Sequence, residues 1–141
     1  MTIENSDLIY LPHQLHNFSF GKVYFFEHMM ISEFKEGIVF TYKNALEFIS
    51  QAENYYGTER KLVYISNRIY SYSVDPVDWI KLGSSYNNLM AIGVINYTSF
   101  KKKVFFVEKL FCRKPMMSFD YLKEAVDWAY ELTQVHESKA G

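Results

Sequence analysis

Two short runs of apolar residues, Leu62–Ile65 and Leu89–Ile95, constrain the fold of this chain more than any other feature. Each run lies between polar residues, and each is far too short to span a bilayer. Continuous apolar runs of this length are typical of strands covered on both faces, as the strands of a parallel sheet are. The two runs therefore predict buried strands in an α/β fold.

A strand pair is predicted upstream of the first run. The segments Lys22–Phe26 and Met29–Phe34 are rich in aromatic and long apolar residues. A tight turn at Glu27-His28 would join them into an antiparallel hairpin. The residues before Phe18 are weakly patterned, so they are expected to form an arm or an extra strand.

The clearest helical pattern begins after Thr41, a good N-cap residue. Apolar residues between Ala45 and Tyr56 follow the i, i+3, i+4 spacing of a helix face, and Gly57 stands where helices commonly end. A first helix is therefore predicted between Thr41 and Gly57.

Three more helices and one strand are expected downstream. A second helix opens at Asp75-Pro76 and ends near Gly83, because aspartate caps well and proline suits the first helical position. A third helix starts at Thr98 or Ser99, and a last strand at Pro115–Phe119 suits a sheet edge. A fourth helix has an apolar stripe between residues 122 and 132. The third helix is expected to face inward through Phe100, Val104, Val107 and Phe111, with Phe105 beside them.

These segments predict a hairpin-led α/β domain in which helices pack on a mixed, largely parallel sheet. Four to five strands and about four helices are expected. The 141 residues suit a single domain, which is placed at 18–134 between the N-terminal arm 1–17 and a frayed tail at 135–141.

Composition excludes several classes of function. The net charge is −1, and the basic run Lys101–Lys103 is short, so no nucleic-acid partner is expected. The single cysteine, Cys112, cannot form an internal disulfide, and the N-terminus lacks the pattern of a signal peptide. A cytoplasmic protein without membrane insertion is therefore predicted.

No motif in the sequence predicts catalysis. Glycine-rich phosphate loops and a GxSxG elbow are absent, and the four histidines are scattered along the chain. Cys112 near Arg113 and Lys114 is read as a structural thiol. We therefore expect a protein that is not an enzyme and that has no cofactor and no metal site.

The segment from Ser66 to Asp75 is the strongest candidate for a contact site. It follows a buried strand and precedes a helix, where ligands concentrate in open α/β sheets. Ser73 and Ser71 lie close to that helix start, where a phosphate would meet free backbone N–H groups. Alternatively, the serines satisfy backbone groups in a turn and Arg68 pairs with a neighbouring acid. The candidate interaction residues are Asn67, Arg68, Tyr70, Tyr72, Asp75 and Trp79.

The order of these segments resembles the STAS-like domains, whose fold is also called SpoIIAA-like or the anti-anti-sigma-factor fold. The segments that carry the resemblance are VYIS (63–66), DPVDWIKLG (75–83), LMAIGVI (89–95), EKLF (108–111) and MSFDYLKEAVDWA (117–129). The chain looks most like small stand-alone bacterial members of flavobacterial type. Members of the family switch when a serine after a central strand is phosphorylated. Ser73 matches that position most closely, with Ser71 as the alternative, although no acid precedes Ser73 and no glycine follows it.

The resemblance implies a regulatory domain that binds another protein, as a degenerate antagonist of an anti-sigma factor with an anti-sigma or kinase-like partner. The alternative is a small-molecule or lipid-binding module, because some relatives of this fold are grouped with lipid-binding domains. The twelve Tyr and twelve Phe residues could line the apolar pocket of such a module. Exposed aromatic residues and the edge strand at Pro115–Phe119 would also allow a homodimer.

Overall fold

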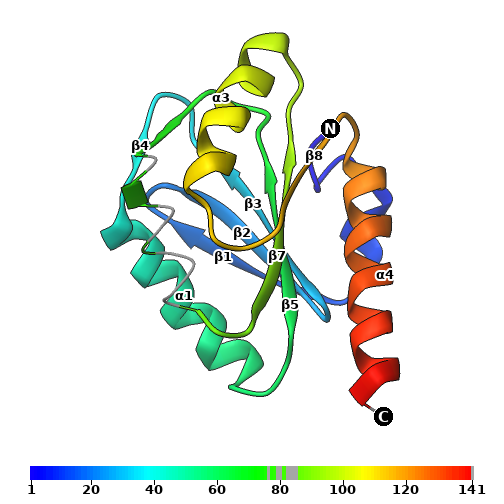
Figure 1. Ribbon diagram of the computed structural model, residues 1–141. Coiled ribbons are helices and arrows are strands. Elements are labelled where there is room, and N and C mark those ends of the chain that lie inside the picture. The colour runs from blue at the N-terminus through cyan, green and yellow to red at the C-terminus, as the bar shows by residue number, and fades with distance from the viewer. Residues whose placement is uncertain (76, 79–80, 82–85, 141) are drawn as a thin grey trace.

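The computed structural model describes residues 1–75, 77–78, 81 and 86–140, and it shows an α/β fold built on a six-stranded mixed sheet (Figure 1). Strands β1 and β2 and strands β2 and β3 pair antiparallel, whereas β3, β5, β7 and β8 are parallel. The sheet has the order β1 (His13–Phe18), β2 (Gly21–Phe26), β3 (Met29–Phe34), β5 (Leu62–Asn67), β7 (Leu89–Ile95) and β8 (Met116–Phe119). The predicted α/β class, the hairpin and both buried strands are confirmed.

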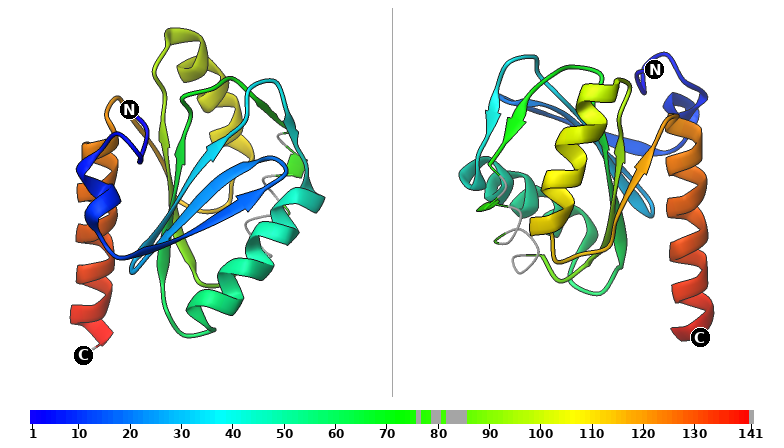
Figure 2. Two further views of the ribbon diagram at one scale, coloured as in Figure 1. Left: turned by 180° about the vertical axis from the view of Figure 1, so that it is seen from behind. Right: turned by 45° about the horizontal axis from the view of Figure 1, so that its top comes forward.

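Helices cover both faces of the sheet. Helices α1 (Tyr42–Tyr56) and α3 (Ser99–Phe111) lie on one face, and α4 (Leu122–Ala140) lies on the other beside the short 3-10 helix η1 (Asp7–Tyr10) (Figure 2). A two-stranded parallel pair, β4 (Val39–Phe40) with β6 (Ser73–Val74), stands apart from the main sheet.

The sheet separates two apolar clusters, because successive side chains of a strand point to opposite faces. Phe25 and Tyr64 belong to the cluster beneath α1 and α3, whereas Tyr24 and Ile65 belong to the cluster beneath α4. Strands β2, β3, β5 and β7 are therefore buried on both sides, which explains their near-continuous apolar sequence.

The first helix forms as predicted. The hydroxyl of Thr41 accepts a hydrogen bond from the Asn44 backbone N–H, and the Asn44 side chain accepts one from the Thr41 backbone. Gly57 follows the helix with a positive φ of 78°, a conformation that glycine adopts without strain. The phenol of Tyr56 donates to the carbonyl oxygens of Phe26 and Met29, so the end of α1 is tied to the β2–β3 turn.

The counts of elements differ from the prediction. The main sheet has six strands instead of four to five, because the segment 13–18 forms the edge strand β1. Three α-helices have both ends among the described residues. Most residues of the predicted second helix, 75–83, lie outside the described ranges. Helix α4 continues to Ala140, through the segment expected to fray.

The predicted inner face of α3 is wrong. Only Phe105 and Glu108 are buried on this helix, whereas Phe100 is 73% exposed. Val104, Val107 and Phe111 are also exposed. Apolar residues occur on every side of α3, so their spacing could not select the side that faces the sheet.

Candidate functional site

The carboxyl ends of β3, β5 and β7 meet at one edge of the sheet because the three strands are parallel. The segment from Asn67 to Asp75 leaves the sheet at this edge. Polar side chains form two hydrogen-bonded networks there, one on each face of the sheet. These networks decide which of the predicted site residues face solvent.

The network on the α3 side is built around Arg68. Its guanidinium forms two hydrogen bonds with the Glu108 carboxylate, at 2.5 and 2.7 Å, and both side chains are buried. Arg68 Nε also donates to the Ser66 hydroxyl. The Arg68 guanidinium therefore joins the start of the loop to α3.

Tyrosine hydroxyls extend this network into the core. The Tyr72 and Ser66 hydroxyls lie 2.6 Å apart, and the Tyr64 and Ser32 hydroxyls also lie 2.6 Å apart. The guanidinium of Arg68 lies over the Tyr72 ring, 5.5 Å from its centroid. Burial raises the pKa of Tyr64 well above its ordinary value, so its phenol stays protonated and can donate.

The second network lies on the α4 side of the same edge. Glu33 Oε2 accepts hydrogen bonds from the Ile3 backbone N–H at 2.8 Å and from Asn67 Nδ2 at 3.0 Å. Asn67 Oδ1 in turn accepts one from the Tyr97 hydroxyl. Burial raises the pKa of Glu33, and it raises the pKa of Tyr97 to about 12. Asn67 is thus a buried connector between strands.

The predicted site residues therefore divide into two groups. Asn67 and Arg68 face inward, and Tyr72 is half-buried. The alternative for Arg68, pairing with an acid, is confirmed, with Glu108 as its partner. Trp79 lies outside the described residues. The exposed members are Tyr70, Ser71, Ser73 and Asp75.

The exposed residues lie on a loop that is held at several points. The Ser71 backbone N–H donates to the Glu36 carboxylate at 2.7 Å, and Ser73 pairs with Val39 in the β4–β6 ladder. Asp75 Oδ1 accepts from the Val77 backbone N–H, the bond expected of a capping residue. The phosphorylation and interaction roles of these residues stay predictions.

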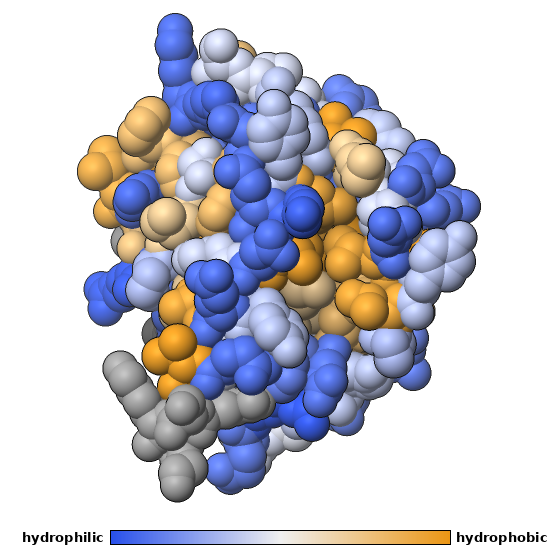
Figure 3. Space-filling model, turned by 90° about the vertical axis from the view of Figure 1, so that its right-hand side faces the viewer, coloured by the Kyte–Doolittle hydropathy of each residue, from blue (hydrophilic) through white to orange (hydrophobic). Residues whose placement is uncertain are grey.

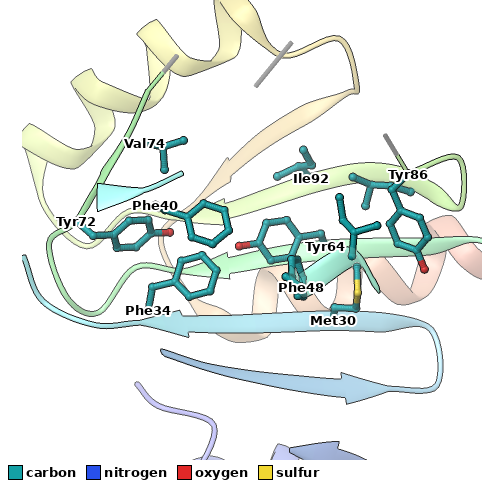
Figure 4. Close-up of a pocket in the computed structure, with 11 residues that line it drawn as sticks. Met30, Phe34, Phe40, Phe48, Tyr64, Tyr72, Val74, Tyr86 and Ile92 are labelled. Atoms are coloured by element: carbon teal, nitrogen blue, oxygen red, sulfur yellow. The ribbon is translucent and has the colours of Figure 1, made fainter. Parts of the chain in front are cut away.

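A small apolar cavity lies in the core between the sheet and α1 (Figure 4). Its volume is about 30 Å³, room for roughly one water molecule, whereas ligand pockets usually measure roughly 300–1,000 Å³. The hydroxyls of Tyr64 and Tyr72 point toward each other across it (Figure 4). This cavity does not accommodate a lipid or another organic ligand.

Sequence reasoning missed an exposed apolar surface on α3. The side chains of Phe100, Phe106 and Leu110 are 73%, 67% and 83% exposed. Lys103 and Lys109 are exposed on the same helix. We call these five residues the α3 face. Its signal in the sequence was the large number of apolar residues on one helix, more than one buried side can use.

The described residues contain no cluster of three or more His, Cys, Asp or Glu that could hold a metal ion. Burial raises the pKa of the Cys112 thiol, which makes it a weak nucleophile. Within the described parts of the chain, no helix is both long and apolar enough to cross a membrane.

Comparison with known proteins identifies the fold. No model of a protein family matches the sequence, and no curated protein matches it. The structure is similar to the crystal structure of an uncharacterized protein of the DUF3478 family with a SpoIIAA-like fold from Shewanella loihica PV-4. That match has a TM-score of 0.50 and 13% sequence identity, and it covers 84% of this chain and 92% of the other. The fold is therefore SpoIIAA-like, as the resemblance to STAS-like domains implied.

Proposed function

We propose that this chain is a non-catalytic, regulatory protein-interaction domain of STAS type that binds its partner through the α3 face. The observation that carries the proposal is the exposure of Phe100, Phe106 and Leu110 on one helix. Phe106 and Leu110 are four residues apart and therefore neighbours on the helix surface. Adjoining exposed apolar side chains on a folded domain can mark a binding site. Covering one such side chain contributes about 1.5–3 kcal/mol, so the α3 face can supply much of the energy of a specific complex.

The charges around the α3 face indicate what the partner looks like. Lys103 and Lys109 are exposed beside the apolar residues, whereas Lys102 pairs with Asp120 at 2.7 Å. A partner with an apolar groove and carboxylates at its rim would complement this helix. An anti-sigma factor or a kinase-like protein is the partner class that the STAS resemblance implies.

The segment that leads to the two serines is bonded to the start of α3, which suggests how binding at the α3 face is regulated. Lys101, in the first turn of α3, donates from Nζ to the carbonyl oxygens of Arg68 and Ile69. A phosphate on Ser71 would lie close to the Glu36 carboxylate, which accepts from the Ser71 backbone N–H. Like charges repel there, so Ser73 is the better candidate for a regulatory phosphate.

The test compares exposed apolar residues on two faces of the domain. Phe106→Ser combined with Leu110→Ser should abolish capture of the partner from the native host, and purified partner should lose binding at least about tenfold. Tyr10→Ser is the matched control, because Tyr10 is 85% exposed but lies on η1, on the opposite face. Both variants should keep wild-type stability.

Two outcomes would contradict the proposal. One is that the double variant and the Tyr10→Ser control capture the same proteins as the wild type. The other is that the double variant loses binding to anionic phospholipid vesicles and to no protein, which would make the α3 face a membrane-binding surface.

The regulatory part has its own test. Ser73→Asp should change the affinity for the purified partner, whereas Ser73→Ala should bind as the wild type does. Equal affinity for all three proteins, together with unmodified Ser71 and Ser73 in protein isolated from the host, would exclude a phosphoserine switch.

A further inference from the structure

A groove on the opposite face of the domain is large enough for a ligand. It lies between α4, the β2–β3 turn and the residues that follow η1, and its volume is about 460 Å³. Figure 3, which faces the right-hand side of Figure 1, shows hydrophobic atoms in a hollow between polar side chains. We call it the α4 groove. It is lined by Leu11, Pro12, Phe26, Glu27, His28, Met29, Val126, Asp127, Ala129, Tyr130 and Glu131.

The floor of the α4 groove is apolar and fixed in place. Phe26, Met29 and Ala129 are buried. The Tyr56 phenol holds the carbonyl groups of Phe26 and Met29, and the Val63 backbone N–H donates to the carbonyl of His28. The β2–β3 turn is therefore anchored from beneath, so the groove exists before a ligand arrives. Preformed apolar pockets with a few polar groups are typical of small-molecule sites.

The rim of the groove is acidic. Glu27, Asp127 and Glu131 have exposed side chains, and no Lys or Arg occurs among the described residues that line the groove. His28 lies 3.7 Å from the Glu27 carboxylate. Arg60 lies nearby, and its guanidinium donates to the Glu27 carbonyl oxygen from outside the lining. The carboxylates of Glu27, Asp127 and Glu131 would repel an organic anion, whereas they would attract a cation.

We propose that the α4 groove binds a small amphiphilic organic cation, a protonated amine on an aromatic or aliphatic body. The apolar body would lie between Leu11, which is 48% exposed, and the edges of Phe26 and Met29, and the ammonium group would face the carboxylates of Asp127 and Glu131. Tyr130, which is 60% exposed, provides an aromatic wall for the body or the cation. This site is separate from the α3 face, because α3 and α4 lie on opposite faces of the sheet (Figure 1).

Two probes with the same body and opposite charge test the proposal. Calorimetry would measure binding of 1-naphthylmethylammonium and of 1-naphthylacetate to the whole chain. The changes in amide chemical shifts on binding, measured by nuclear magnetic resonance, would locate the site. The ammonium probe should bind about tenfold more tightly than the carboxylate probe, and high salt should reduce that preference. Amide shifts should concentrate at the β2–β3 turn and along α4.

Variants then separate the effect of charge from that of apolar contact. Asp127→Asn with Glu131→Gln should weaken ammonium binding about two- to fivefold per carboxylate and leave the carboxylate probe unchanged or tighter. Tyr130→Ala should weaken both probes. Glu124→Gln is the matched control, since Glu124 is exposed on α4 but does not line the groove.

Several results would overturn this inference: no binding of the ammonium probe, equal binding of the two probes, or unchanged ammonium affinity in the Asp127→Asn, Glu131→Gln variant. Amide shifts confined to α3 would overturn it as well. The Phe106→Ser, Leu110→Ser variant should bind the ammonium probe as the wild type does, so the outcome does not depend on the protein partner.

Discussion

The buried pair of Arg68 and Glu108 fixes the loop at the edge of the sheet. Both charges are buried, and their mutual hydrogen bonds compensate for the lost hydration. Removing one partner leaves the other charge buried and unpaired. Removing one partner should therefore cost much more stability than replacing both partners with apolar residues, and this difference tests whether the pair is buried and charged.

Glu108→Gln should lower the free energy of unfolding by about 3–5 kcal/mol, because the Arg68 charge loses its counter-ion inside the protein. Urea titration followed by circular dichroism would measure the change. The double variant Arg68→Met, Glu108→Leu should recover most of the loss, since it buries no charge. A Glu108→Gln protein within about 1 kcal/mol of the wild type would contradict a buried ion pair.

Glu33 should make stability depend on pH in the direction opposite to that of most carboxylates. Burial raises its pKa in the folded protein above the ordinary value of 4.5, so the folded state holds this proton more tightly than the unfolded state. The stability that Glu33 contributes is therefore fully present below pH 4.5 and is lost as pH rises through the raised pKa.

Glu33→Gln tests this sign. The glutamine oxygen can still accept from Ile3 and Asn67, so the variant should gain stability relative to the wild type at pH 7. The gain should shrink as pH falls toward 4.5, where the wild-type carboxyl is also protonated. Thermal unfolding of both proteins across this range provides the measurement, and a difference that grows on acidification would contradict the assignment.

Single residues also show where sequence reasoning stops. The cap at Thr41 and the end at Gly57 were predictable because their partners lie within one helical turn. Arg68 was recognised as a residue that could pair with an acid, but Glu108 is 40 residues away in the sequence. Nothing local could identify that partner, because the sheet and α3 together bring the two side chains into contact.

At the scale of elements, α1 is the case in which local rules and tertiary packing agree. Thr41 and Asn44 form a reciprocal cap, and the buried side of the helix matches the predicted stripe. Helix α3 is the opposite case. Apolar residues occur on all sides of the α3 axis, but only the side with Phe105 and Glu108 is buried against the rest of the domain. A charged residue is therefore buried while phenylalanines remain exposed.

Thr41→Ala should lower the free energy of unfolding by about 1 kcal/mol, because the Asn44 backbone N–H loses its acceptor at the start of α1. Ser50→Ala in the same helix is the control, since Ser50 is exposed in the helix interior and alanine favours a helix. Chemical denaturation of both variants would compare the two positions. Equal stabilities would show that the cap does not contribute.

At the scale of the whole molecule, the apolar runs predicted buried strands in a mixed, largely parallel sheet, and this is confirmed. The number of strands was underestimated because β1 reads HQLHNF, a mostly polar sequence. Such a strand pairs through its backbone at the edge of the sheet and buries no side chain fully. Hydrophobic patterning cannot distinguish it from a surface arm, whereas the hydrogen bonds with β2 define it.

The two-sided architecture predicts how the two apolar clusters contribute to stability. Ile49 on α1 belongs to one cluster, and Ile95 on β7 belongs to the other. Ile49→Val and Ile95→Val should each cost about 0.5–1.5 kcal/mol, since each removes one buried methylene group. The two side chains share no cluster, so the costs should add within about 0.5 kcal/mol in the double variant.

All three proteins should unfold in one transition, because the strands that carry both clusters form a single hydrogen-bonded sheet. Urea titrations monitored by far-ultraviolet circular dichroism and by tyrosine and tryptophan fluorescence would measure this. Two separate transitions, or a double-variant cost well below the sum, would mean that the two faces of the sheet do not unfold as one unit.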